Sequence, residues 1–286
     1  MDTMSPSQLD SLSGCRLSWQ LLYKQGWRSR RSSLALELGT ALHYALEMYY
    51  SKKGSLVKSF EDWIDKRVRE MSEEFPDSAT ELYDQRALGI SMLEGYLTEY
   101  EGKEDFTILA TEKYATRPLL APKGQFKLNP GCDISVRLDG LVKDNQTGRL
   151  FVLEHKSYSQ FSPQTFDMDI QISAQTYVAE TLVKEMNLEG EMSGVIWNGL
   201  RKMLPGPRVK NKLFERHRLY RNERQIDIFA HRAYWQIVES RRKDFAIFPN
   251  PSAIRCPQCD LLPVCRSYHL GEDWKFLLEQ TYDRRG

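Results

Sequence analysis

The spacing of hydrophobic residues divides the chain into a helical first part and a mixed second part. Apolar residues recur every three or four positions from Leu34 to Tyr50 and again over residues 56–101, with a break near Phe75-Pro76. This period predicts amphipathic helices. Ser5-Pro6-Ser7 has the chemistry of a helix start, and a helical pattern follows it within the first 30 residues. The first hundred residues are therefore expected to be largely helical.

Beyond Phe106 the pattern shifts to short runs of branched and aromatic residues separated by turn residues, which is typical of strands. We expect strands at residues 106–115, 133–143, 149–157 and 195–200, and helices at residues 169–186 and 222–243. This order predicts an α/β fold, with a central sheet flanked by helices. We expect one domain over residues 1–286, in which residues 51–104 form a helical insertion.

The composition is that of an ordinary globular protein, with 41% hydrophobic and 28% charged residues among 286. A chain of this length can bury one large core or two modest ones. No stretch approaches the roughly 18 apolar residues of a membrane span, and the start lacks the layout of a secretory signal. We therefore expect a cytoplasmic protein without a membrane partner. The formal net charge of +1 says little about ligands, because nucleic-acid binding depends on local charge clusters.

Two acids and a lysine gather in one predicted hairpin. The turn signal at residues 144–148 lies between two apolar runs. If the hairpin is centred between Gln146 and Thr147, Asp139 lies opposite Glu154 on the same face of the sheet. Because side chains alternate along a strand, Lys156 shares that face.

Such a patch suits catalysis on a phosphodiester. Two carboxylates at this separation can hold Mg²⁺ or Mn²⁺, and the lysine can orient a water or stabilise charge on phosphorus. The side chain of His155 points to the other face, but its backbone carbonyl can still reach the metal. The alternative is a set of ion pairs on a solvent-exposed hairpin, which needs no function.

The cysteines have metal-ligand spacing. Cys256, Cys259 and Cys265 follow one another closely, and an intracellular chain has little use for structural disulfides. A fourth ligand is required. His269 would complete a zinc site, whereas a fourth thiolate would favour an iron–sulfur cluster. Cys132 is expected to be a small buried apolar residue.

The motifs together resemble the PD-(D/E)xK nucleases. Asp139-Gly140 followed by Glu154-His155-Lys156 looks like their D...ExK signature, and residues 39–43, GTALH, match the GxxxH element of the RecB-like branch, which includes CRISPR-adaptation nucleases. The resemblance implies a restriction-endonuclease-like core and makes His43 a metal ligand. It also gives Glu112 a supporting role.

The resemblance extends to two further regions. The helix after Asp169 is similar to the QxxxY motif, which implies a catalytic role for Gln171 and a weaker one for Tyr177, although Gln175 stands four residues after Gln171. The lone Cys15 occupies the place of the upstream cysteine in the iron–sulfur nucleases of this branch. This implies a [4Fe-4S] cluster held by Cys15, Cys256, Cys259 and Cys265, with residues 250–270 closing it.

Basic residues form two clusters that suit phosphate binding. They are Arg28, Arg30 and Arg31 beside Trp27, and Arg201, Lys202, Arg208, Lys210, Lys212, Arg216 and Arg218. We expect a DNA nuclease, an exonuclease preferring single strands, in repair, recombination or viral or mobile-element DNA processing. Its partners would be DNA with free ends and a separate helicase or recombination protein, because the chain lacks an ATPase motif. The alternatives are an inactive iron–sulfur DNA-binding subunit and a zinc-stabilised adaptor.

Overall fold

The computed structural model describes residues 2–120, 131–160, 163–206 and 212–284. These residues form two compact units. The terminal unit combines the described parts of Met1–Ser32, Pro118–Ile134 and Asp227–Gly286, and the sheet unit combines those of Ser33–Arg117 and Ser135–Ile226. The single domain expected from the sequence stays a prediction.

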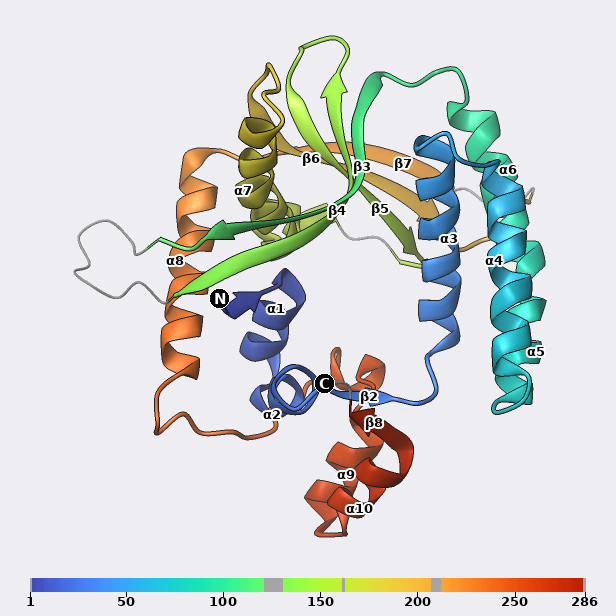
Figure 1. The fold of residues 1–286 in the computed structure, drawn as a ribbon. Coiled ribbons are helices and arrows are strands. Elements are labelled where there is room, and N and C mark those ends of the chain that lie inside the picture. Colours follow the sequence, from blue (N-terminus) through green and yellow to red (C-terminus); the bar gives the residue numbers. More distant parts are fainter. Residues whose placement is uncertain (1, 121–130, 161–162, 207–211, 285–286) are drawn as a thin grey trace. The chain divides into compact units, whose positions relative to one another are not determined.

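A mixed β-sheet dominates the sheet unit (Figure 1). Strand β5 pairs antiparallel with β4 and parallel with β6, β6 pairs antiparallel with β7, and β3 adds to β4. The strands are β3 (Phe106–Pro118), β4 (Cys132–Asp144), β5 (Leu150–Tyr158), β6 (Met192–Arg201) and β7 (Phe214–Tyr220). Each of the four strands expected from the sequence is present, and the α/β fold class with a central mixed sheet is confirmed.

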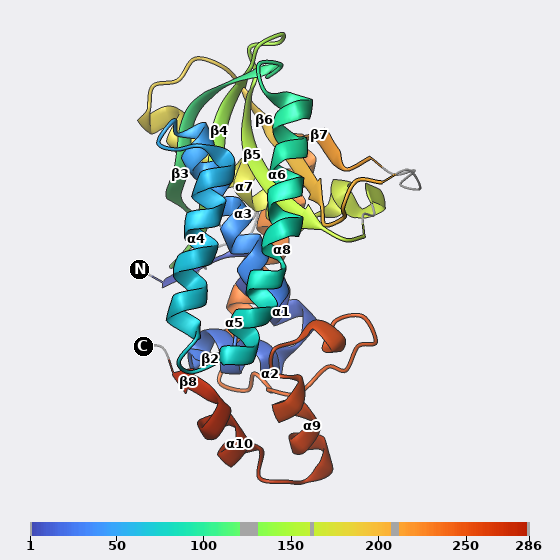
Figure 2. The same ribbon diagram turned by 90° about the vertical axis from the view of Figure 1, so that its right-hand side faces the viewer.

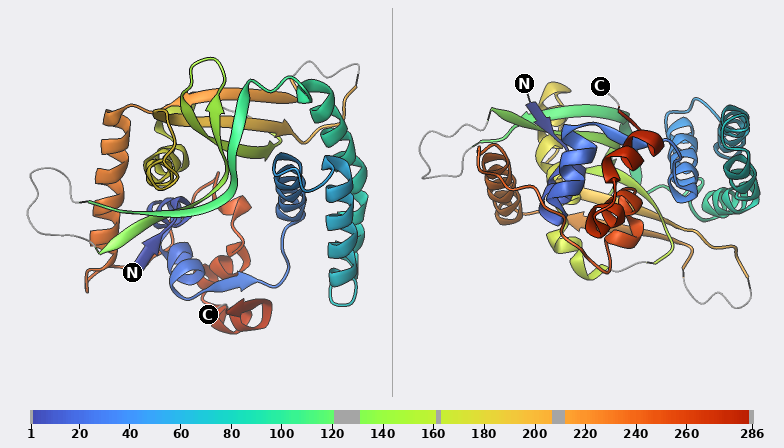
Figure 3. Two further views of the ribbon diagram at one scale, coloured as in Figure 1. Left: turned by 45° about the horizontal axis from the view of Figure 1, so that its top comes forward. Right: turned by 90° about the horizontal axis from the view of Figure 1, so that it is seen from below.

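Helices cover both faces of this sheet. Helix α7 lies on one face, and α3 lies against the other with α4 behind it (Figures 1 and 3). The helices of the sheet unit are α3 (Leu34–Tyr50), α4 (Leu56–Met71), α5 (Pro76–Asp84), α6 (Arg86–Tyr100) and α7 (Ile170–Glu185), with a 3₁₀ turn at Pro163–Met168. The side chains of Ser33 and Asp169 cap α3 and α7 by accepting hydrogen bonds from backbone N–H groups. Phe60, Phe151 and Ile196 belong to the core between helices and sheet.

The terminal unit joins segments from the two ends of the chain. Strand β2 pairs antiparallel with β8, and α9 packs beside α10 (Figure 2). Leu21 shares a hydrophobic cluster with Leu261, Val264, Leu278 and Tyr282. The unit contains β1 (Asp2–Met4), α1 (Pro6–Gly14), α2 (Arg16–Trp19), a π-helical turn (Gln20–Lys24), β2 (Trp27–Ser29), a 3₁₀ turn (Cys256–Gln258), α9 (Leu262–Leu270), α10 (Trp274–Thr281), β8 (Tyr282–Arg284) and most of α8 (Glu223–Ser240). None of the described helices has the length and apolar character to cross a membrane.

Strand β7 was not expected from the sequence, because its residues FERHRLY read as part of a basic stretch. Its arginines are used inside the fold. Arg216 bonds Glu104 at 2.5 Å with a side chain only 9% exposed, and Arg218 bonds Asp144 at 2.8 Å. Both arginines are therefore paired with acids in the fold, and their assignment to a DNA-binding strip stays a prediction.

The β4–β5 hairpin has the register expected from its turn. Gly140 lies opposite Leu153, and Leu141 opposite Val152. The Asp144 carboxylate organises the turn, because its Oδ1 accepts hydrogen bonds from the backbone N–H groups of Gln146 and Thr147 and from the Thr147 hydroxyl. Burial raises the pKa of Asp144, but the bonds from Thr147 and Arg218 outweigh it, so this pKa lies below its ordinary value.

Replacing Asp144 by alanine should lower the free energy of unfolding by about 2–3 kcal/mol at neutral pH, because charged hydrogen bonds are lost at a buried site. Since the folded-state pKa is depressed, this stabilisation is present above the ordinary aspartate pKa and disappears as the pH falls through the lowered value. Urea unfolding of both proteins across the acidic range tests this. Asp105→Ala, which removes only the more exposed partner of Arg218, is the control. An equal loss in both variants would contradict the role of the turn.

Candidate active site

Asp139 on β4 connects α3 to strand β5. Its Oδ2 lies 3.4 Å from Nδ1 of His43 and accepts a hydrogen bond of 2.8 Å from the backbone N–H of His155. Gly39, one turn before His43, faces Ser157, since an added Cβ would be in ordinary contact with its hydroxyl oxygen at 3.6 Å. Helix α3 therefore passes directly over the end of β5, and His43 and Asp139 meet although they are far apart in the sequence.

Glu154 on β5 is almost completely buried, and both of its oxygens are occupied. Oε1 lies 2.5 Å from Nζ of Lys156 and 2.7 Å from Nε2 of Gln171. Oε2 accepts a hydrogen bond of 2.5 Å from Nε2 of Gln175. Lys156 also donates to Oε1 of Gln171 at 3.2 Å. Glu154, Lys156 and the first turns of α7 thus form one hydrogen-bonded group.

The site concentrates negative charge. Burial raises the pKa of Glu154 and the charge of Asp139 raises it further, against the opposing effects of Lys156 and Gln175. Burial lowers the pKa of His43, but Asp139 and Glu154 outweigh it, so the pKa is raised. The pKa of Lys156 is also raised, because Glu154 outweighs its burial. Burial raises the pKa of Asp139, but the interactions with His43 and His155 outweigh it, so this pKa is lowered. The shifts of Glu154, His43 and Lys156 therefore favour protonation around an ionised Asp139, as expected where two carboxylates lack a compensating cation.

The residues fit a divalent metal by the chemistry of their donor atoms. Two carboxylates and an imidazole suit Mg²⁺ or Mn²⁺, and the electrostatic influence of Asp139 on Glu154 requires the two acids to be close. In the described parts of the chain, no three His, Cys, Asp or Glu side chains stand ready to coordinate a metal together. Lys156 and the two glutamines occupy the oxygens of Glu154 instead, so metal binding requires this group to rearrange.

Glu112 on β3 lies at the edge of this acidic group. Burial and the charge of Asp139 raise its pKa, whereas Arg137, 2.6 Å away, lowers it. Its φ angle is +46°, a left-handed conformation that is unusual for a glutamate within a strand. The sequence predicted a supporting role here without indicating this backbone conformation.

The two glutamines of α7 differ from the sequence-based expectation. Gln171 contacts Lys156 and Glu154, but the second residue on Glu154 is Gln175 rather than Tyr177. Tyr177 is buried, and its ring lies 4.0 Å from the guanidinium carbon of Arg117. The signal for Gln175 was its spacing, because residues four apart share a helix face.

All five cysteines belong to the terminal unit, and four of them lie close enough to influence one another. Burial raises the pKa of Cys265, and the nearby groups of Cys15, Cys256 and Cys259 raise it further. All five cysteines are free thiols, and Cys132 is buried as expected. The backbone N–H of Ser252 donates to Sγ of Cys256 at 3.2 Å. The isolated N-terminal cysteine and the three C-terminal ones therefore lie in one neighbourhood.

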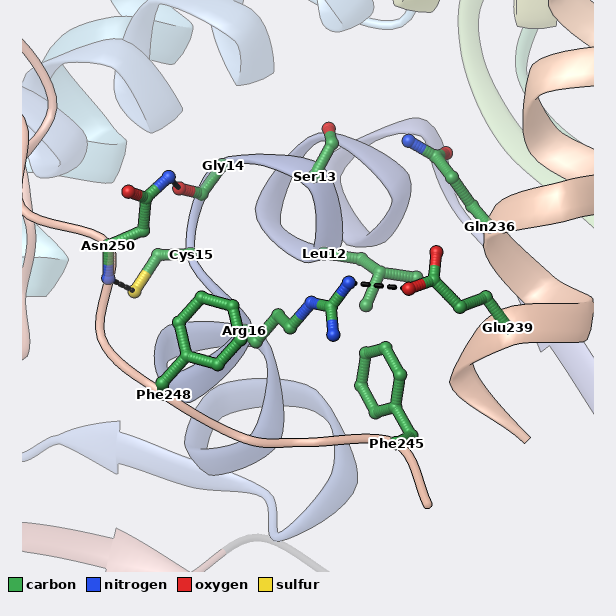
Figure 4. Close-up of a pocket in the computed structure, with 10 residues that line it drawn as sticks. All are labelled: Leu12, Ser13, Gly14, Cys15, Arg16, Gln236, Glu239, Phe245, Phe248 and Asn250. Atoms are coloured by element: carbon green, nitrogen blue, oxygen red, sulfur yellow. Dashed lines mark hydrogen bonds and ion pairs between the residues drawn. The ribbon is translucent and has the colours of Figure 1, made fainter. Parts of the chain in front are cut away.

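Cys15 also lines a pocket of about 290 Å³ (Figure 4). The backbone N–H of Asn250 donates to Sγ of Cys15 at 3.4 Å, and its side-chain amide donates to the carbonyl of Gly14. Arg16 bonds Glu239 at 2.5 Å, and its guanidinium lies over the ring of Phe245. These contacts fix the backbone on both sides of Cys15.

The basic residues expected to bind DNA have varied surroundings. Arg30 pairs with Asp283 at 2.9 Å, Arg28 donates to two backbone carbonyls, and Lys202 donates to the carbonyl of Ala35. Arg201 lies over the ring of Tyr158, whereas Arg31 and Lys212 are exposed. Arg208 and Lys210 lie outside the described residues. DNA contact by these side chains stays a prediction.

Comparison with known proteins identifies the family of the chain. No curated protein matches the chain significantly. The model of the PD-(D/E)XK nuclease superfamily matches residues 3–266, a range that contains His43, Asp139, Glu154 and Lys156. This match covers nearly the whole sequence, and the mixed sheet with its flanking helices agrees with the fold. The chain therefore belongs to the PD-(D/E)XK nuclease superfamily.

Proposed function

We propose that this protein is a metal-dependent deoxyribonuclease, an exonuclease that prefers single-stranded DNA and acts beside a separate helicase in repair, recombination or mobile-element DNA processing. The observation that carries the nuclease assignment is the group formed by Asp139, Glu154 and Lys156, in a chain that belongs to a superfamily of nucleases. The preference for strand ends rests on the resemblance to the RecB-like branch.

The metal would be held by Asp139, Glu154, His43 and the backbone carbonyl of His155. When bound, a divalent ion lowers the pKa of a water and offsets the charge of the phosphate. The protein's own contribution is orientation and charge. Lys156 is held in its protonated form by Glu154 and is suited to donate a hydrogen bond to the attacking water or to a phosphate oxygen. Gln171 steadies both partners, because its amide donates to Glu154 and accepts from Lys156.

End-labelled single- and double-stranded DNA, incubated with Mn²⁺, Mg²⁺ or EDTA, tests the proposal. Metal-dependent cleavage that is faster on single strands and produces a ladder from one end is the expected result. Cleavage inside a circular single strand would contradict the exonuclease assignment. Failure of the folded, metal-bound protein to cut any DNA would favour an inactive DNA-binding protein instead.

The second part of the proposal is a [4Fe-4S] cluster held by Cys15, Cys256, Cys259 and Cys265. Its support is that four thiols from the two ends of the chain gather in one unit, where two of the sulfurs accept backbone N–H hydrogen bonds. Thiolates are the ligands that soft iron centres prefer, and N–H donors to sulfur are common around such clusters. Its role would be structural.

Cys259→Ser should abolish cluster binding and lower the stability of the anaerobically purified protein by several kcal/mol, because the cluster closes a loop between the chain ends. Iron and sulfide analysis, visible absorption and thermal unfolding measure the effect. Cys132→Ala is the matched control and should keep its iron, because Cys132 is buried on strand β4 and none of the other four cysteines influences its pKa. Stoichiometric zinc in the wild-type protein, without sulfide, would contradict the cluster and favour a zinc site.

A further inference from the structure

A row of polar side chains crosses the sheet behind the active site. His155, Asn198 and Arg216 occupy directly paired positions on the neighbouring strands β5, β6 and β7 (Figure 1). Nδ1 of His155 lies 2.8 Å from Nδ2 of Asn198, and Oδ1 of Asn198 accepts a hydrogen bond of 2.8 Å from Nε of Arg216. Asn198 is fully buried and His155 is 3% exposed. A buried row of this kind is stable only when each polar group is paired.

At the β7 end of this row, Arg216 forms hydrogen bonds with residues of α3 and α6 and with Glu104, which follows α6. Arg216 donates to Glu104 at 2.5 Å and to the hydroxyls of Tyr50 and Tyr96 at 2.9 and 2.8 Å. The two hydroxyls lie 2.6 Å apart, and Tyr96 also accepts from Asn198. Several partners therefore hold the Arg216 guanidinium in one orientation, and its hydrogen bond to Oδ1 fixes the orientation of the Asn198 amide.

This arrangement determines which nitrogen of His155 carries a proton. A guanidinium only donates hydrogen bonds, so the Asn198 atom that faces Arg216 must be the amide oxygen. The NH₂ group of Asn198 then faces Nδ1 of His155, which must act as the acceptor. The proton of the neutral ring consequently resides on Nε2.

His155 touches the proposed metal ligands through both its backbone and its ring. Its N–H donates to Oδ2 of Asp139, and its ring packs edge-on against that of His43 with centroids 6.1 Å apart. On another side the ring stacks on Tyr50, with centroids 5.5 Å apart and planes 13° apart. Its neighbours in the chain are Glu154 and Lys156. A change in the position of the His155 ring would therefore shift each of these groups.

We propose that Asn198 and Arg216 are positioning residues of the active site, which act through His155 by holding its ring, its Nε2–H tautomer and the adjoining backbone of β5 in one arrangement. Only the predicted effect of these residues on activity depends on the proposed metal-dependent function. The tautomer and the hydrogen-bonded row belong to the metal-free protein.

Asn198→Asp provides the sharpest test because the two side chains have nearly the same shape. The aspartate can still accept from Arg216, but it offers no N–H to His155, so the imidazole proton should move to Nδ1. Long-range ¹H–¹⁵N spectra of metal-free protein report the tautomer, and calorimetric titration with Mn²⁺ reports metal affinity. We expect the wild type to show the Nε2–H form, and the variant to show the Nδ1–H form with about 10–100-fold weaker Mn²⁺ binding. The kcat for DNA cleavage should fall while KM for DNA stays the same.

Arg218→Met is the matched control. It removes an arginine that forms ion pairs on the same strand, but Arg218 lies opposite Ile196 and pairs with Asp105 and Asp144. We expect it to lose stability and to keep the wild-type tautomer and Mn²⁺ affinity. If Asn198→Asp fails to fold, Tyr96→Phe replaces it as the test. This variant removes one hydroxyl from the row and should weaken Mn²⁺ binding about fivefold.

Three results would overturn the proposal. They are an Nδ1–H tautomer in the wild type, unchanged Mn²⁺ affinity and kcat in Asn198→Asp after the tautomer has shifted, and unchanged Mn²⁺ affinity in Tyr96→Phe. A wild-type protein that binds no Mn²⁺ would instead contradict the proposed function, while the tautomer measurement would still decide whether the row is formed.

Discussion

Lys156→Ala should slow DNA cleavage by about 10²–10⁴-fold while the protein stays folded and still binds Mn²⁺. Nζ of Lys156 lies against Glu154 and Gln171, so the alanine leaves the proposed ligands Asp139 and His43 in place. What it removes is the cation beside the reacting groups, whose value is largest in the transition state. Single-turnover cleavage with saturating protein measures the chemical step directly.

The companion measurements make this result specific. Lys113→Ala removes an exposed lysine from strand β3 and should cut at the wild-type rate. Lys156→Arg keeps the charge but has a larger, planar head group, and we expect only a small recovery of activity. A Lys156→Ala protein that cuts within a factor of about two of the wild type would remove this lysine from the mechanism.

Asp139→Asn should weaken Mn²⁺ binding by at least about 100-fold and abolish cleavage at ordinary metal concentrations. The amide oxygen can still accept from the N–H of His155, so the local backbone should persist. The lost charge matters more, because Asp139 is one of the two carboxylates that give the site its affinity for a cation. Calorimetric titration of Mn²⁺ into the metal-free protein is the measurement.

The stability of Asp139→Asn separates a metal ligand from a structural residue. Because the charge of Asp139 raises the pKa of Glu154, neutralising it relieves a repulsion between two buried acids. The pKa of Asp139 is itself lowered, because the interactions with His43 and His155 outweigh its burial, so its charge also contributes stability that the variant loses. Without metal, these opposing effects should leave the unfolding temperature of the variant close to that of the wild type. Asp105→Asn, with the same charge change at a partly exposed position, should alter neither metal affinity nor cleavage. A large loss of stability with normal Mn²⁺ affinity would contradict the assignment.

The sequence predicted the β4–β5 hairpin well, because local signals decide it. The turn at residues 144–148 sets the hairpin register, and side-chain alternation then places Glu154 and Lys156 on one face. Helix α3 was also predicted with its observed bounds, Leu34–Tyr50, since its capping serine and apolar period agree. In these regions neighbouring residues contain the information that fixes the structure.

The features that the sequence did not predict depend on tertiary contacts. In the sequence, the charged residues of β7 resemble a solvent-exposed or DNA-binding stretch. In the fold, its arginines form ion pairs with Glu104 and Asp144. Gln175 can bond Glu154 only in the folded protein, where α7 lies over Glu154. The row through Asn198 likewise depends on three strands lying side by side. Pairings between distant segments are not encoded in any local period.

The left-handed backbone at Glu112 has an evolutionary consequence. Outside glycine, asparagine and aspartate, this conformation costs about 1–2 kcal/mol per residue, so selection for stability alone would favour one of those residue types. We infer that a glutamate occupies this position despite the cost because its carboxylate is needed beside Asp139. Relatives that keep an acidic residue at this position are thus expected to share the local charge requirement, and those with glycine to have abandoned it.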